Sequence, residues 1–358
     1  MDRDGAFNNS TVDARAVSAW PAPPPPSDDP TNPFIGRFGL RAVWGMLIFI
    51  VLFIMLSFAF NVATRLAEGK SALPPKTPQR AQGQPVAKSE VPNARSTTIG
   101  DGEAFLAVTL ASWILSRIER RKIGVYGIGR KRLSDFLPGA FWGLATLSML
   151  VGALRFTHHL VFDGRALSGS AAFAFGAKWL LAFLCVGLLE EYLSRGYMQY
   201  TLTRGMITMA ERISPRHARA VAFWAAAVIM SCLFGAVHLF NPGETAPGII
   251  AVFLAGMVFS YALWHTGSLW WAIGFHMAWD WAQSFLYGVP DSGFLSAGRL
   301  FNTHSQGNTL LSGGTTGPEG SVLVIPTLLL VMVIIRFTAR AGVQPPLEPL
   351  GATHSLPP

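Results

Sequence analysis

Long apolar runs separated by short polar or basic segments are the main feature of this sequence. Eight runs are candidate membrane-spanning helices, with approximate limits 42–63, 102–118, 136–160, 172–200, 219–240, 247–264, 269–288 and 321–337. The first run follows Arg41 and carries no charged residue as far as Ala63. Each helical residue adds about 1.5 Å, and a hydrocarbon core is about 30 Å thick, so this run is long enough to cross a bilayer. The pattern predicts an all-α fold, a polytopic membrane bundle of about eight transmembrane helices.

Polar stretches divide the rest of the chain. Residues 1–36 are rich in proline and predict a disordered tail, and residues 69–101 predict a disordered polar loop, because neither stretch has enough apolar surface to fold alone. Residues 37–68 contain the first transmembrane helix. We expect residues 102–340 to form the main helix bundle and residues 341–358 to be a second disordered tail.

Composition supports a lipid environment. Hydrophobic residues make up 51% of the chain and charged residues only 13%, whereas soluble domains carry about 25% charged residues. The net charge of +8 lies mostly between the apolar runs, which is typical of membrane topology and contact with anionic headgroups. We therefore expect a lipid bilayer, and no nucleic acid, as a partner. Cys185 and Cys232 lie inside apolar runs without metal-type spacing, so we interpret both as packing residues.

The basic segments also predict an orientation. Three of them follow the second, fourth and last runs: Arg117, Arg120, Arg121, Lys122, Arg130, Lys131 and Arg132; Arg204, Arg212, Arg216 and Arg219; Arg336 and Arg340. The positive-inside rule assigns these segments to the cytoplasm, and with eight spans both termini are then cytoplasmic. The loop 65–95 is also basic and would lie outside, but long loops count less in this rule. We expect a multi-pass protein of a bacterial-type plasma (inner) membrane.

Ionisable residues inside the fourth run are the first sign of chemistry. The string LLEEYLSRGYMQ contains Glu190, Glu191 and Arg195, and a charge at the centre of a membrane helix costs about 2.5–3.5 kcal/mol. Glu191 and Arg195 are four residues apart and can pair on one helix face. Glu190 is turned away by about 100° and is left available for acid–base chemistry. Alternatively, the helix ends here and the charges snorkel to the interface.

Two further runs carry histidines. FGAVH places His238 four residues after Phe234, and HMAWD places Asp280 four residues after His276. Taken singly, His238 fits a core or interfacial histidine, and His276 with Asp280 fits a local packing pair. Convergence of the three helices would stabilise all of these groups, and would form a proteolytic site, a metal site or a proton relay.

At these residues the sequence resembles a known family. EEYLSRG resembles the EExxxR motif, FGAVH the FxxxH motif, and HMAWD the HxxxN or HxxxD motif. These motifs mark the CPBP intramembrane proteases, which include type II CAAX prenyl proteases and bacteriocin-processing, lysostaphin-resistance-A-like members. Their order and spacing match over residues 134–288, with the core motifs within 172–288. Asp280 stands where the prenyl-protease members mostly have Asn.

The resemblance implies an intramembrane endopeptidase that cleaves a membrane-proximal peptide bond in a membrane protein or a lipidated peptide. It implies that Glu190 with His238 activates a water, and that His276 with Asp280 stabilises the oxyanion. No cofactor is expected. Zinc is the alternative, with Glu190, His238 and His276 as its ligands.

The resemblance assigns a supporting role to three further residues, Glu191, Arg195 and Phe234, which would hold the site together. Two other functions remain open. A non-catalytic relative would act as a membrane scaffold or immunity protein. A proton- or ion-coupled transporter would use the same polar cluster, although its typical inverted repeat with broken helices is not evident.

Overall fold

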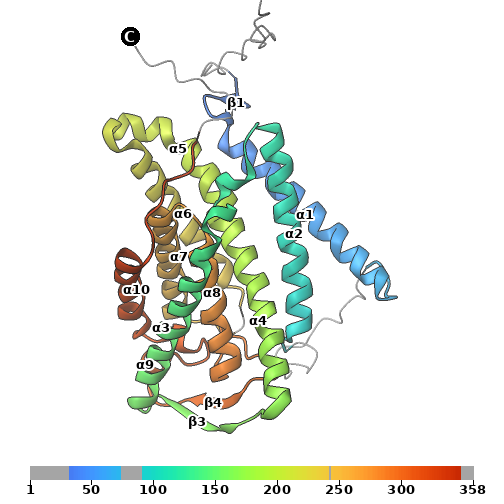
Figure 1. Cartoon of the computed structure of the whole chain (residues 1–358), viewed down its shortest axis with the longest axis vertical. Helices are drawn as coiled ribbons and strands as arrows, with labels where there is room; N and C mark the ends of the chain where they lie inside the picture. Colours follow the sequence, from blue (N-terminus) through green and yellow to red (C-terminus); the bar gives the residue numbers. More distant parts are fainter. Residues whose placement is uncertain (1–31, 74–90, 242, 348–358) are drawn as a thin grey trace, which may run out of the picture.

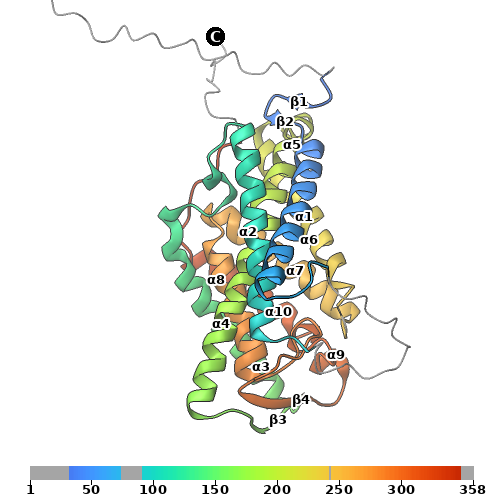
Figure 2. The ribbon, with the colours of Figure 1, turned by 90° about the vertical axis from the view of Figure 1, so that its right-hand side faces the viewer.

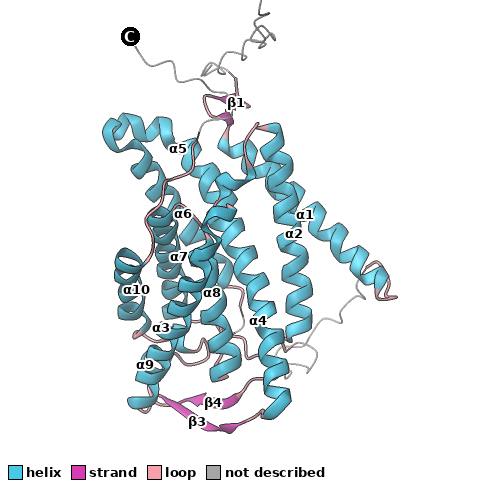
Figure 3. Ribbon diagram, in the orientation of Figure 1, coloured by secondary structure: helices cyan, strands magenta, loops and turns pink. Residues whose placement is uncertain are grey.

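The computed structural model describes residues 32–73, 91–241 and 243–347, and this part of the chain is a helical bundle with two small antiparallel strand pairs (Figures 1 and 3). The helices are α1 Ala42–Ala67, α2 Ala94–Ile118, α3 Phe136–Phe156, α4 Gly169–Glu191, α5 Gln199–Ile213, α6 Ala218–His238, α7 Ala246–Thr266, α8 Trp270–Trp281, α9 Thr309–Ser312 and α10 Val324–Thr338. The strands are β1 Ile35–Gly36, β2 Gly39–Leu40, β3 Leu160–Arg165 and β4 Phe301–Ser305. The predicted all-α class is confirmed. Most of the predicted tails and part of the predicted loop 69–101 lie outside the described residues.

Six segments of the described chain are long and apolar enough to cross a membrane. They contain α1, α2, α3, α4 with α5, α6 and α7, and correspond to the first six predicted runs. The last two predicted runs form shorter helices. In the seventh, α8 continues into a π-helical turn, Ala282–Tyr287, and in the eighth α10 has 15 residues.

The fourth predicted run is part of a much longer helix. α4, a π-helical turn at Tyr192–Met198 and α5 follow one another without a break over the 45 residues Gly169–Ile213. At about 1.5 Å per residue this helix is about 65 Å long, roughly twice the thickness of a hydrocarbon core. It is therefore longer than one crossing requires, and it continues beyond residue 200, where the fourth predicted run ends.

The second helix also starts earlier than the predicted residue 102. Asn93 caps α2, because its side chain accepts a hydrogen bond from the backbone N–H of Ser96 at 3.0 Å. The first turns of α2 are polar, so the prediction of a loop as far as residue 101 is wrong from Ala94 onward.

The two ends of the bundle differ. β1, β2 and α5 lie at one end, which we call the basic pole, and β3 and β4 lie at the other, which we call the sheet pole (Figures 1 and 2). At the sheet pole, β3 pairs antiparallel with β4 from Leu160↔Ser305 to Arg165↔Phe301. This pairing ties the α3–α4 connection to the segment that follows α8.

A buried ionic cluster holds the basic pole together. Arg204 donates to Glu119 at 2.6 Å and to the carbonyl oxygen of Phe38 at 3.0 Å, and Arg121 lies 3.4 Å from Glu119. All three charged side chains are at most 3% exposed. The cluster joins α2, α5 and the segment before α1, so it fixes α5 to the rest of the bundle.

Part of the C-terminal segment packs against the basic pole, although residues 341–358 were expected to form a disordered tail. The Tyr200 hydroxyl donates to the carbonyl oxygen of Pro346 at 2.7 Å, and the Gln344 amide donates to the carbonyl oxygen of Leu263 at 3.0 Å. Leu347 is buried in the core. The prediction is therefore wrong for residues 344–347, and residues 348–358 lie outside the described chain.

α3 and α8 pack unusually closely, through small residues. Gly139 and Gly143 are four residues apart on α3, the spacing that lets membrane helices approach each other. A Cβ atom on either glycine would collide with the backbone carbonyl of Trp271 or Phe275 on α8. Because α8 also carries His276 and Asp280, this contact sets the position of half of the predicted site.

Replacing Gly143 with alanine should force α8 away from α3. We expect Gly143→Ala to lower stability by about 1–3 kcal/mol, the usual cost of overpacking, and to reduce any activity that depends on His276. Thermal unfolding in detergent would measure the first effect. Gly152→Ala is the matched control on the same helix, because a Cβ atom there meets nothing within 4 Å. Equal melting temperatures for the two variants would contradict the proposed role of the contact.

Candidate active site

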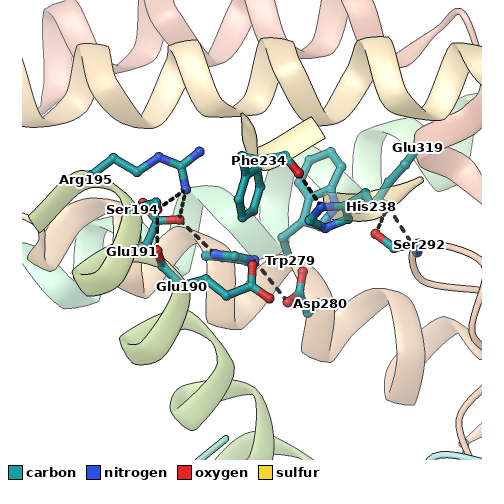
Figure 4. A network of polar contacts seen from close by, with 11 residues as sticks. Glu190, Glu191, Ser194, Arg195, Phe234, His238, Trp279, Asp280, Ser292 and Glu319 are labelled. Carbon is teal, nitrogen blue, oxygen red and sulfur yellow. Dashed lines mark hydrogen bonds and ion pairs between the residues drawn. The ribbon is translucent and has the colours of Figure 1, made fainter. Parts of the chain in front are cut away.

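All four residues predicted to be catalytic line one cavity of about 380 Å³. Glu190 comes from α4, His238 from α6, and His276 and Asp280 from α8. α2, α7 and α10 complete its walls, together with the loops that follow α6 and α8. The convergence expected from the sequence is therefore present, and it brings together residues separated by up to 90 positions (Figure 4).

A buried ion pair supports one side of the cavity. Arg195 Nη1 donates to Glu191 Oε1 at 2.9 Å, and the two side chains are 1% and 0% exposed. The guanidinium also lies 4.4 Å from the centre of the Phe234 ring, a favourable cation–π distance. The spacing of four residues places the pair on one face of the helix, as predicted, where the α-helix changes into the π-helical turn. Such turns occur often at functional sites.

Glu191 also orients His276. The Nδ1–H of His276 donates to Glu191 Oε1 at 3.0 Å, because an ionised carboxylate only accepts. Nε2 is then the ring nitrogen available to the cavity, 3.8 Å from Glu190 Oε2 and 3.4 Å from Asp280 Oδ2. Glu191 thus fixes which nitrogen of His276 faces the cavity.

The two adjacent glutamates have different surroundings. The side chain of Glu191 is 0% exposed and its Oε1 atom accepts from both Arg195 and His276, whereas the side chain of Glu190 is 32% exposed and lines the cavity. This is the result of the turn of about 100° between neighbouring helical residues. Glu190 is therefore the glutamate that a water or a substrate can reach.

His238 is also held in one tautomer. Its Nδ1–H donates to the carbonyl oxygen of Phe234 at 2.8 Å, which leaves Nε2 as a hydrogen-bond acceptor. The Phe234 ring lies beside the imidazole, with centres 4.6 Å apart (Figure 4). In the described chain, no direct hydrogen bond or ion pair joins His238 to Glu190, so a molecule in the cavity would have to connect them.

Three carboxylates that no motif singled out line the same cavity: Asp101, Asp291 and Glu319. Glu319 accepts hydrogen bonds from Trp279 Nε1 at 3.2 Å and from the Ser292 hydroxyl at 3.1 Å (Figure 4). Asp291 accepts one from the Ser284 hydroxyl at 2.9 Å. Asp291 and Glu319 belong to connecting segments without a recognisable motif. Only their acidic side chains, in a chain with few charged residues, could have indicated them in the sequence.

Burial raises the pKa of both Asp291 and Glu319. The nearby Asp280 carboxylate adds to this effect at Asp291, and Glu244 adds to it at Glu319. Carboxylate oxygens of Asp280, Asp291 and Glu319 lie within 4.8 Å of one another, a grouping that suits a hard divalent cation. The described residues contain no such grouping of Glu190, His238 and His276, the ligands of the zinc alternative.

The fold and the site together define a multi-pass membrane protein with ionisable side chains around an internal cavity. Residues 172–282 match the family model for type II CAAX prenyl endopeptidase, Rce1-like, and this stretch is a domain of that family. It contains all three motifs, so the resemblance inferred from them is confirmed. No curated protein and no solved structure matches the chain. The loops that carry Asp291 and Glu319 lie outside the matched residues.

Removing the charge of Arg195 should destabilise the protein strongly. In an Arg195→Met variant, Glu191 stays buried without its counterion, and loss of one partner of a buried pair costs about 3–5 kcal/mol. Thermal or denaturant unfolding in detergent would measure the loss. Lys178→Met is the matched control, because Lys178 lies on the exposed face of the same helix. A similar stability for both variants would show that the ion pair does not support the site.

Proposed function

We propose that the chain is an intramembrane endopeptidase that hydrolyses a membrane-proximal peptide bond with a water activated by Glu190. The observation that carries this proposal is the cavity shared by Glu190, His238 and His276, in which Glu191 and Phe234 hold the two imidazoles in fixed orientations. A general base, an acceptor nitrogen and a potential oxyanion donor are the groups that amide hydrolysis requires.

The proposed reaction begins at Glu190. Its carboxylate, assisted by the acceptor Nε2 of His238, removes a proton from water while the water oxygen attacks the scissile carbonyl carbon. The tetrahedral intermediate collapses when the C–N bond breaks, and the proton held by Glu190 passes to the leaving nitrogen. The greater exposure of Glu190 compared with Glu191 supports this assignment, because the base must reach both the water and the substrate.

His276 is the proposed oxyanion donor. Three carboxylates, Glu190, Glu191 and Asp280, lie beside its ring, and an imidazole that carries a proton on each nitrogen can donate from both. Nδ1–H is already used by Glu191, so Nε2–H is the donor directed at the cavity. An ionised Asp280 cannot donate a hydrogen bond. We infer that it stabilises the charge of His276 and orients its ring, in place of the Asn of most prenyl-protease members.

The proposed membrane arrangement has eight crossings, in which α8 with its π-helical turn and α10 are the short seventh and eighth. The arginine-rich connections then lie in the cytoplasm with both termini, in a bacterial-type plasma membrane. The proposed substrates are membrane proteins or lipidated peptides, since their cleavage sites are held close to the bilayer.

Glu190→Gln should lower the cleavage rate at least about 100-fold, because an amide cannot accept the proton from water. The purified full-length chain would be incubated with detergent-solubilised membrane proteins, and new N-termini would be identified by mass spectrometry. Glu211→Gln is the control for loss of one carboxylate, since Glu211 lies on α5 away from the cavity, in an exposed pair with Arg37.

Glu191→Gln provides the contrast with Glu190→Gln. It should chiefly lower stability, because Arg195 then has no buried counterion. If well-folded Glu190→Gln protein produced the same N-termini at the same rate, the proposed hydrolytic role would be lost. The scaffold or immunity function would then be favoured.

A further inference from the structure

The cavity reaches only one end of the bundle. On α4 its lining ends at Glu190, before the π-helical turn, and on α8 it begins at Phe275. Its loop residues all come from the ends of helices that face the sheet pole: Pro92, Asn241, Asp291, Ser292, Phe294, Ser296 and Glu319. Within the described chain, neither α5 nor the connections at the basic pole contribute to the lining.

The basic pole is closed off from the cavity by Arg195. Its guanidinium lies 4.4 Å from the Phe234 ring centre and 5.5 Å from that of Phe259, and both rings line the cavity. On the other side of Arg195, the C-terminal segment with Gln344 and Leu347 leaves a space of only about 30 Å³. A peptide cannot pass through this layer without breaking the buried pair of Arg195 with Glu191.

Exposed cations are more numerous at the basic pole than at the sheet pole, where Arg155 and Arg165 are exposed together with Asp163. Exposed cations of the basic pole include Arg117, Arg120, Lys122, Arg130, Lys131, Arg212 and Arg216. The described lining of the cavity contains five carboxylates and neither lysine nor arginine. The rule assigns the basic pole to the cytoplasm, so the open side of the cavity faces away from it.

We propose that substrate reaches Glu190 from the sheet pole, so that the enzyme cuts the extracytoplasmic juxtamembrane segment of a membrane protein. The inference rests on the proposed peptidase function. The acidic lining also restricts the substrate sequence, because acidic substrate residues beside the scissile bond would lie close to Asp280, Asp291 and Glu319. An internal segment with few acidic residues fits this lining.

Cysteine labelling tests the direction of access. The full chain, with Cys185 and Cys232 replaced by alanine, would be expressed in a bacterial inner membrane and treated with a membrane-impermeant maleimide. Phe294→Cys reports the cavity mouth, Ser305→Cys the sheet pole and His217→Cys the basic pole; all three native residues are exposed. We expect the first two cysteines to react in intact spheroplasts and the third only after lysis. Reaction of His217→Cys alone in spheroplasts would overturn the proposal.

A second measurement uses the unmodified chain. New N-termini that depend on Glu190 should map to extracytoplasmic segments of membrane proteins, with few acidic residues beside the cut. Cuts in cytoplasmic segments would overturn the proposal even if Glu190 proved essential. Conversely, labelling as expected without any Glu190-dependent cut would remove the proposed function but leave the orientation intact. The two failures are therefore distinguishable.

Discussion

The buried ion pair between Glu191 and Arg195 is the interaction on which the site depends. Two charges in a low-dielectric interior are tolerated only when each has a close partner, and here the distance is 2.9 Å with almost no exposure. The pair also binds the surrounding groups, since Glu191 accepts from His276 and Arg195 lies over Phe234. α4, α6 and α8 are thus connected through a single carboxylate and a single guanidinium.

This arrangement explains why adjacent glutamates can have different roles. Glu191 is buried and accepts from Arg195 and His276 through Oε1, whereas its neighbour Glu190 is turned toward the cavity without a strong partner. The site thereby obtains a carboxylate that is held in place by its helix yet remains open to water. The close contact of α3 with α8 at Gly139 and Gly143 adds the second constraint, because it determines how far His276 extends toward Glu190.

The sequence predicted local parts of the site better than its surroundings. Spacings of four residues predicted the Glu191–Arg195 contact and the approach of His276 to Asp280, because a helix makes such neighbours whatever the rest of the fold does. Asp291 and Glu319 were missed, since the path of a loop depends on tertiary contacts such as the pairing of β3 with β4. Polar helix ends caused two further errors, because the first turns of α2 and the second half of α5 have the composition of loops. The packing of residues 344–347 was missed because it depends on tertiary contacts such as that of Tyr200 with Pro346.

The same ion pair also affects the end of the bundle from which a substrate could enter the cavity. Because Arg195 lies against Phe234 and Phe259, which line the cavity, the group that supports the proposed catalytic residues also lies directly behind the cavity wall. Opening a path from the basic pole would separate Arg195 from Glu191 and release His276 from its orientation. A peptide that arrived from that side would therefore disrupt the chemistry it needs. Access from the sheet pole would leave the pair intact. One interaction therefore both orients His276 and closes the cavity toward the basic pole.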